Sequence, residues 1–221
     1  MCFSASVSFG ASALLAGTGV VALQKIESPK MFPFACTPIL FSVHQLTEGF
    51  LWLSLQYPDW ISWYKPALYS YLFISQAFWP FWIPFIIWIM EPDSIRKKWV
   101  FNFWCLGVIT FIYILYCVLV SDVSAFASAG HIRYNVDYRS LYLKHVLYSL
   151  TVVVPVFLSS FRYMKLLGGS MVASLILSYI FYEYWVISVW CFFAAILSAL
   201  VLLVIANNKE SVALASIPGF K

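Results

Sequence analysis

Long apolar stretches joined by short connections occupy nearly the whole chain, and they restrict what it can fold into. A helix needs about 20 mainly apolar residues to cross a bilayer. Stretches of this kind fall at 5–25, 32–56, 66–90, 98–120, 141–161, 167–183 and 185–207. Only 10% of the 221 residues are charged, whereas a soluble domain carries roughly 25%. The sequence therefore predicts an all-α, polytopic transmembrane bundle of about seven spans.

The predicted bundle forms one domain, 1–207, followed by a short cytoplasmic tail, 208–221. The first ten residues contain neither a charged segment nor a small-residue cleavage site, so the first stretch is interpreted as a retained span. The sixth stretch is the shortest, and only the tight turn at 181–185 separates it from the seventh. Six spans followed by a re-entrant hairpin is the alternative count.

Lysine and arginine in the short connections predict the orientation, because cytoplasmic loops are enriched in these residues. With the N-terminus outside and the C-terminus cytoplasmic, the inner face holds Lys25, Lys30, Arg96, Lys97, Lys98, Arg162, Lys165, Lys209 and Lys221. The outer face holds fewer, namely Lys65, Arg133, Arg139 and Lys144. The net charge of +4 is explained by this distribution and indicates no nucleic-acid partner. The lipid bilayer is the partner that the composition predicts.

Several local features add expectations about packing. Ser8, Ser12 and Ala16 recur every four residues, and small residues at this spacing permit close helix packing, so the first span is predicted to be central. Pro80 and Pro84 predict a kink in the third span. The longest connection, 121–140, is either a partial lid or a mobile loop. Its His131 is expected to be solvated, and Lys144 after it is expected to extend to the interface.

One span carries titratable groups within its apolar run. His44 and Glu48 lie four residues apart, so they share a helix face, and Gln45 lies close to that face. An ionised carboxylate facing lipid near the bilayer centre costs roughly 2.5–3.5 kcal/mol, so the polar face is predicted to point into the bundle. It is either a structural pair that holds helices together or a ligand, metal or proton site.

Depth along the spans suggests which partners these groups meet. At a rise of 1.5 Å per residue, Glu48 lies about 12 Å, and His44 about 18 Å, below the outer end of its span. Cys191 lies about 9 Å below the outer end of the seventh span. Cysteine, histidine and carboxylate together are typical zinc ligands. The candidate ligands are Cys2, His44, Glu48 and Cys191, with Gln45, His145, Glu183 and Trp190 as secondary candidates.

Three functional hypotheses remain open from the residues alone. The first is a buried His/Glu/Cys site in the outer half, with zinc as its most concrete form and a binding or hydrolytic role, since zinc with an open position activates water. The second is a small-molecule or proton-coupled transporter or receptor. The third is a structural membrane protein in which His44 and Glu48 only pack. No sequence motif decides whether the protein is an enzyme, which ligand it binds or its oligomeric state.

Three stretches carry a resemblance to a known group of proteins. They are 1-MCFSASVSFG-10, 38-PILFSVHQLTEGFLWLSL-55 and 187-ISVWCFFAAILS-198. Together they resemble an uncharacterised family of bacterial multi-spanning membrane proteins that begin Met-Cys-Phe-Ser-Ala. The resemblance implies that Cys2, the Glu48 region and the Trp190–Cys191 region belong to a recurring arrangement. It also implies a bacterial inner membrane, and it supplies no catalytic assignment.

Overall fold

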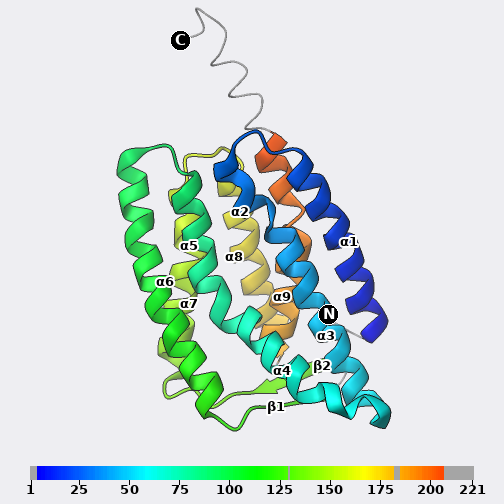
Figure 1. Cartoon of the computed structure of the whole chain (residues 1–221). Coiled ribbons are helices and arrows are strands. Elements are labelled where there is room, and N and C mark those ends of the chain that lie inside the picture. Colours follow the sequence, from blue (N-terminus) through cyan, green and yellow to red (C-terminus); the bar gives the residue numbers. More distant parts are fainter. Residues whose placement is uncertain (1–3, 129, 182–184, 207–221) are drawn as a thin grey trace, which may run out of the picture.

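The computed structural model describes residues 4–128, 130–181 and 185–206, and helices make up most of them (Figure 1). Helical segments run side by side between two ends of the molecule. One end carries a small β-hairpin and is called the hairpin end; the other is called the opposite end. The long helices are α1 (Ala5–Gln24), α3 (Thr37–Gln56), α6 (Ser94–Val120), α7 (Leu141–Leu158), α8 (Met164–Phe181) and α9 (Val186–Leu197). A further helical segment consists of η2 (Pro58–Trp63), α4 (Tyr64–Leu72), η3 (Phe73–Phe78) and α5 (Trp79–Met90).

Within the described residues, six helices are long and apolar enough to cross a membrane, as expected of a multi-pass membrane protein. They are Ala5–Gln24, Pro58–Met90, Ser94–Val120, Leu141–Leu158, Met164–Phe181 and Ser188–Ala206. Helix α3 is as long as α1, but it buries His44, Gln45 and Glu48 together with several hydroxyl side chains. It is therefore the polar helix of the bundle, and its assignment as a seventh span stays a prediction.

The predicted span at 32–56 is not one continuous helix. The chain first forms η1 (Pro29–Met31) and α2 (Phe32–Ala35), and α3 begins only at Thr37. Pro38 occupies the first turn of α3, where a missing N–H is tolerated because that group has no helical partner. The prolines at 29, 33 and 38 explain why the long helix starts later than its apolar composition predicts.

Helix α1 lies at the edge of the bundle in Figure 1, so the prediction of a central first span is wrong. It buries Ser8, Ser12, Leu15, Gly19 and Ala22. The Ser12 and Ser42 hydroxyls each donate to the other residue's backbone carbonyl, at 2.9 and 2.8 Å. A Cβ at Gly19 would overlap Ile39. The small-residue face therefore packs closely on α3, as predicted.

The connection 121–140 forms an antiparallel hairpin, which the all-α prediction did not include. Strand β1 (Ser124–Ser128) pairs with β2 (His131–Asn135), with Ser124 opposite Asn135. Tyr64 anchors the hairpin, because its hydroxyl donates to the Ala125 carbonyl at 3.1 Å and accepts from the Ala125 N–H at 2.8 Å. An isolated hairpin is marginal in water, so packing on the bundle stabilises this one.

Strand β2 buries three side chains, one of which was expected to be solvated. Ile132 and Tyr134 are buried on β2. His131 is also buried, and its ring lies 5.2 Å from that of Trp185 between centroids. The expectation of a solvated His131 is therefore wrong. The hairpin covers one end of the bundle and supplies side chains to its interior.

An irregular segment interrupts the helix before Pro80. The chain is π-helical over η3, and Pro80 lies five residues after Ser75. A π-helical turn would direct the N–H of residue 80 to the Ser75 carbonyl, but proline has no N–H. The Tyr148 hydroxyl from α7 donates to that carbonyl instead, at 2.9 Å. This bond joins α7 to the irregular segment.

Gly107 allows α6 to approach α5 closely, and we expect Gly107→Ala to destabilise the protein. A Cβ at this position would overlap the Pro80 backbone carbonyl, which cannot move without displacing the helix. Overpacking of this kind costs about 1–3 kcal/mol. Thermal unfolding in detergent should therefore show a lowered midpoint. Gly17→Ala is the matched control, since a Cβ there meets nothing within 4 Å; an equal loss in both variants would contradict the explanation.

Candidate functional site

Glu48 is fully buried on α3 and contacts two other elements. The Ser188 hydroxyl from α9 donates to Glu48 Oε1 at 2.9 Å, and the Tyr134 hydroxyl from β2 donates to the same oxygen at 3.5 Å. Both donors come from segments near the hairpin end, and Glu48 lies two helical turns before the end of α3. The carboxylate therefore joins α3, α9 and the hairpin. The predicted convergence of this residue with the seventh apolar stretch is present.

His44 lies one turn below Glu48 in a column of stacked rings. Its imidazole lies 4.5 Å from the Tyr71 ring between centroids, and Tyr71 stacks on Tyr134 at 4.5 Å with an interplanar angle of 7°. On the other side, Phe41 stacks on Trp79 at 4.2 Å. Neither His44 ring nitrogen has a hydrogen-bond partner among the described residues. The column extends from the bundle interior to the hairpin.

Cys191 is buried on α9, one helical turn after Ser188. Glu48, Lys144 and Tyr71 are its polar neighbours. Cys191, Glu48, Tyr71 and His44 therefore belong to one buried cluster. Gln45 is also fully buried on α3. Cys2 and Glu183, the other predicted ligands, lie outside the described residues.

A metal centre needs several converging ligands. Among residues 4–128, 130–181 and 185–206, no group of three or more His, Cys, Asp and Glu side chains is arranged to hold an ion. His145 is on α7, where its ring meets Tyr179 edge-on at 6.1 Å, rather than in the Glu48 cluster. The described members of the predicted ligand set are therefore not arranged as a metal centre.

Three adjoining cavities lie beside this cluster. A vestibule of about 400 Å³ is lined by the second half of the hairpin and by the start of α7. Next to it lies a pocket of about 190 Å³, here called the lysine pocket; both are lined by Tyr134, Leu141, Lys144 and His145. An apolar cavity of about 60 Å³ follows, and it shares Tyr148 and Trp190 with the lysine pocket.

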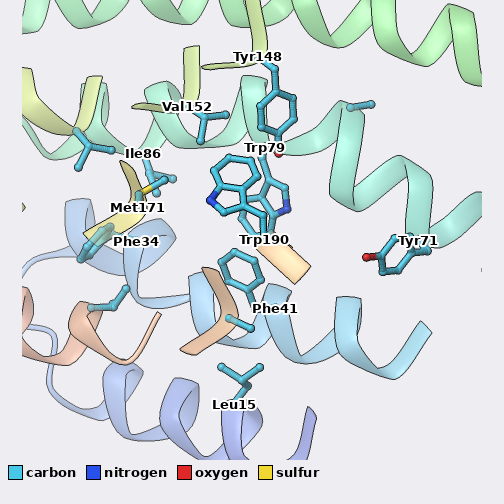
Figure 2. Packing of buried hydrophobic residues seen from close by; sticks show 14 of the residues in the cluster. Leu15, Phe34, Phe41, Tyr71, Trp79, Ile86, Tyr148, Val152, Met171 and Trp190 are labelled. Carbon is cyan, nitrogen blue, oxygen red and sulfur yellow. The ribbon is translucent and has the colours of Figure 1, made fainter. Parts of the chain in front are cut away.

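Aromatic side chains separate the lysine pocket from the apolar cavity. The rings of Tyr148 and Trp190 meet edge-on, with centroids 5.6 Å apart. Figure 2 shows these two residues gathered with Trp79 and Phe41, where α3, α5, α7 and α9 meet. Of His44, Glu48 and Cys191, only Cys191 lines one of the three cavities. Glu48 instead holds Tyr134, which lines the lysine pocket and the vestibule.

Lys144 is buried, so the expectation that it extends to the interface is wrong. Its side chain is 5% exposed, and its Nζ lies 5.2 Å from the Tyr138 ring centroid and 5.5 Å from that of Tyr148. Burial raises the pKa of the Tyr138 phenol, and Cys117 and Tyr113 raise it further. The phenol therefore stays neutral, and its ring face is suited to a cation.

Sequence reasoning gave Lys144 no functional role, although one signal was available. Tyr148 follows it by four residues and so shares its helix face, which offers the ammonium an aromatic partner inside the bundle. The burial itself depends on the connection between β2 and α7, where the ring of Tyr138 lies against the Lys144 ammonium. The secondary candidates Trp190 and His145 do line the lysine pocket, together with Gln76 and Ser149.

Comparison with known proteins places the chain in a family. No curated protein and no solved structure matches it. One family matches residues 1–216, which is nearly the whole length and includes the polar helix, the hairpin and all three cavities. The chain therefore belongs to the family of unknown function DUF6629.

Proposed function

We propose that this protein is a multi-pass protein of a bacterial inner membrane that binds a small molecule from the outer aqueous side. The lysine pocket is the observation that carries the proposal. It combines aromatic walls with a few polar side chains, as small-molecule sites generally do. It adjoins the vestibule at the hairpin end, and the Tyr148–Trp190 contact closes its inner side. This arrangement favours a receptor or binding protein over a transporter.

The distribution of basic residues supports an outer location for the hairpin end. The opposite end carries Lys25, Lys30, Arg96, Lys97, Lys98, Arg162 and Lys165. The hairpin end carries only Lys65, Arg133 and Arg139 near its surface, with Lys144 buried. The positive-inside rule then places the opposite end in the cytoplasm, with the N-terminus outside and the C-terminus inside. Glu48 has a positioning role in this proposal, because it holds Tyr134 at the pocket wall.

Chemical labelling of Ser149→Cys tests both the access and the orientation. Ser149 lines the lysine pocket, so a small, membrane-impermeant methanethiosulfonate reagent added outside spheroplasts should modify the new thiol. Mass spectrometry of the peptide containing residue 149 separates this product from the five native cysteines. Modification only after the cytoplasmic face is opened, or no modification at all, would overturn the proposal.

Two control variants make the labelling result specific. Thr151→Cys places a thiol two residues further along α7 at a fully buried position that lines none of the three cavities, and it should stay unmodified. Ser160→Cys lies exposed between α7 and α8 at the opposite end. It should react only when the reagent reaches the cytoplasmic face. Equal reaction of Ser160→Cys from outside would reverse the proposed orientation.

A second candidate function is zinc binding at His44, which would need further ligands to move toward it, because no group of three or more His, Cys, Asp and Glu side chains in the described part of the chain is arranged to hold an ion. It is favoured by the two nitrogens of this fully buried imidazole, which have no hydrogen-bond partner among the described residues. Zinc with three protein ligands and an open position would support hydrolysis. Elemental analysis of the detergent-purified protein tests this candidate. About one zinc per chain, lost in His44→Ala and Cys191→Ala, would support it, and sub-stoichiometric metal unchanged by either substitution would exclude it.

A further inference from the structure

We propose that the ligand of the lysine pocket is a small organic monocarboxylate with an aromatic body, held through its carboxylate by Lys144. This inference rests on the proposed function and adds the chemical class of the ligand. It is carried by a buried ammonium group that lines a pocket without a carboxylate among its described residues.

The ammonium group of Lys144 is buried without a carboxylate beside it among the described residues. It contacts two aromatic rings, Tyr138 and Tyr148, which stabilise a cation without neutralising it. The carboxylates that line the vestibule, Asp122 and Asp137, are exposed to solvent. A buried charge is strongly unfavourable unless it is paired. Within the described residues the Lys144 ammonium has no ion-pair partner, and an anion in the lysine pocket would supply a counter-charge.

Neutral hydrogen-bond donors surround the same pocket. Trp190 lines it, is 8% exposed, and its indole Nε1–H has no hydrogen-bond partner within the described chain. The Ser149 hydroxyl and the Gln76 amide also line the pocket. Gln76 Oε1 has no partner among described atoms, and an amide flip, which preserves the side-chain shape, would turn its NH₂ group toward that position. A cation with neutral donors suits the oxygens of a carboxylate.

The lysine pocket is large enough for an aromatic ring and adjoins the vestibule. The pocket volume of about 190 Å³ exceeds the roughly 150 Å³ of an apolar cavity that binds benzene. Tyr148, Tyr179, Trp185 and Trp190 supply ring faces and edges around it. The vestibule beside the pocket is lined by polar residues such as Asn135 and Asp137, so a ligand can enter from water. A benzoate-sized acid meets all three conditions, namely charge, volume and access.

Calorimetric titration of the detergent-purified full chain with benzoate and with benzamide tests the inference. Benzamide keeps the shape of benzoate and removes its charge. We expect saturable benzoate binding at least tenfold tighter than benzamide binding, and a tenfold or greater loss of benzoate affinity in Lys144→Gln. Lys144→Arg should retain part of the affinity, because it keeps the charge. Lys65→Gln, an exposed lysine at the hairpin end, should leave binding unchanged.

Ser149→Phe provides a second variant that leaves Lys144 in place. Its ring would occupy the pocket, so it should abolish benzoate binding while the protein still unfolds cooperatively. No benzoate binding by the parent chain, equal affinities for benzoate and benzamide, or unchanged benzoate binding in Lys144→Gln would each overturn the carboxylate assignment. The labelling of Ser149→Cys is independent of these titrations. A labelled pocket that does not prefer benzoate contradicts this inference alone, whereas an unlabelled pocket contradicts the proposed function.

Discussion

Glu48→Ala is expected to cause the largest loss of stability among single substitutions at the candidate site. The change removes the acceptor of the Ser188 hydroxyl and of the Tyr134 hydroxyl, both of which are buried. A buried donor left without a partner costs about 1–3 kcal/mol, and the lost side-chain volume adds to this. We therefore expect a loss of about 3 kcal/mol in the free energy of unfolding. Chemical or thermal unfolding in detergent would measure it.

Glu48→Gln separates hydrogen bonding from charge. The amide keeps an oxygen at the position of Oε1, so both hydroxyl donors retain an acceptor. We expect this variant to lose less than about 1 kcal/mol in the free energy of unfolding, because both hydroxyl groups still donate to a neutral acceptor. If Gln is as harmful as Ala, an acceptor oxygen alone does not replace the Glu48 side chain. If neither variant is destabilised, the contacts of Glu48 do not hold the hairpin and α9.

A double-mutant cycle of Glu48→Ala and Ser188→Ala tests whether Ser188 is the hydrogen-bond partner whose loss destabilises the protein. The Ser188 hydroxyl donates to Glu48 at 2.9 Å, whereas the Ser178 hydroxyl donates to the Ser174 carbonyl of its own helix. The losses of unfolding free energy caused by Glu48→Ala and Ser188→Ala should therefore sum to about 1 kcal/mol more than the loss in the double variant. Glu48→Ala and Ser178→Ala should be additive. Hydrogen exchange of the hairpin amides in Glu48→Ala should also quicken, because Tyr134 loses its acceptor.

The positions of the apolar helices could be predicted from the sequence, because span length and composition are local properties. The predicted stretches 98–120 and 141–161 correspond to α6 (Ser94–Val120) and α7 (Leu141–Leu158). The break before α3 was missed, although Pro33 and Pro38 indicated it. Apolar composition defines a segment that tolerates lipid, but backbone geometry decides where its helix begins.

The hairpin could not be predicted with the same rule. Arg133 and Asn135 alternate with the buried Ile132 and Tyr134, but this alternation is too short to distinguish a strand from a polar loop. Its stability comes from contacts with distant residues, such as Tyr64 and Glu48. The burial of His131 and Lys144 follows from the hairpin and the connection after it, so both residues were misjudged for the same reason.

Only those features of the candidate site that follow from depth along a helix could be predicted from the sequence. Counting residues from the span ends brought Glu48 and the seventh apolar stretch to similar depths, and the structure shows Ser188 of α9 donating a hydrogen bond to Glu48. Depth does not specify which residues line a cavity, because that also depends on rotation about each helix axis. His44 and Glu48 therefore lie behind the pocket wall, while Gln76 and Lys144, which lacked a distinctive motif, line the pocket.

Tyr148→Phe is the second substitution expected to have a large effect. It keeps the ring that separates the two inner cavities and removes only the hydroxyl that donates to the Ser75 carbonyl. That carbonyl precedes Pro80 by five residues and cannot receive a π-helical N–H from it. Removing this donor from a buried acceptor should cost about 1–3 kcal/mol. Thermal unfolding in detergent would show a lowered midpoint with unchanged cooperativity.

Pro80→Ala tests this explanation, because it restores a backbone N–H at residue 80. A π-helical turn would direct this N–H to the Ser75 carbonyl. In the Pro80→Ala background, Tyr148→Phe should cost at least 1 kcal/mol less than in the parent chain. Pro84→Ala is the matched control, since it restores an N–H one turn further along α5, nine residues from Ser75. If Pro84→Ala relieves Tyr148→Phe equally, the effect reflects general relaxation of α5. Relief by Pro80→Ala alone would show that the proline at residue 80 is what makes the Tyr148 bond to Ser75 necessary.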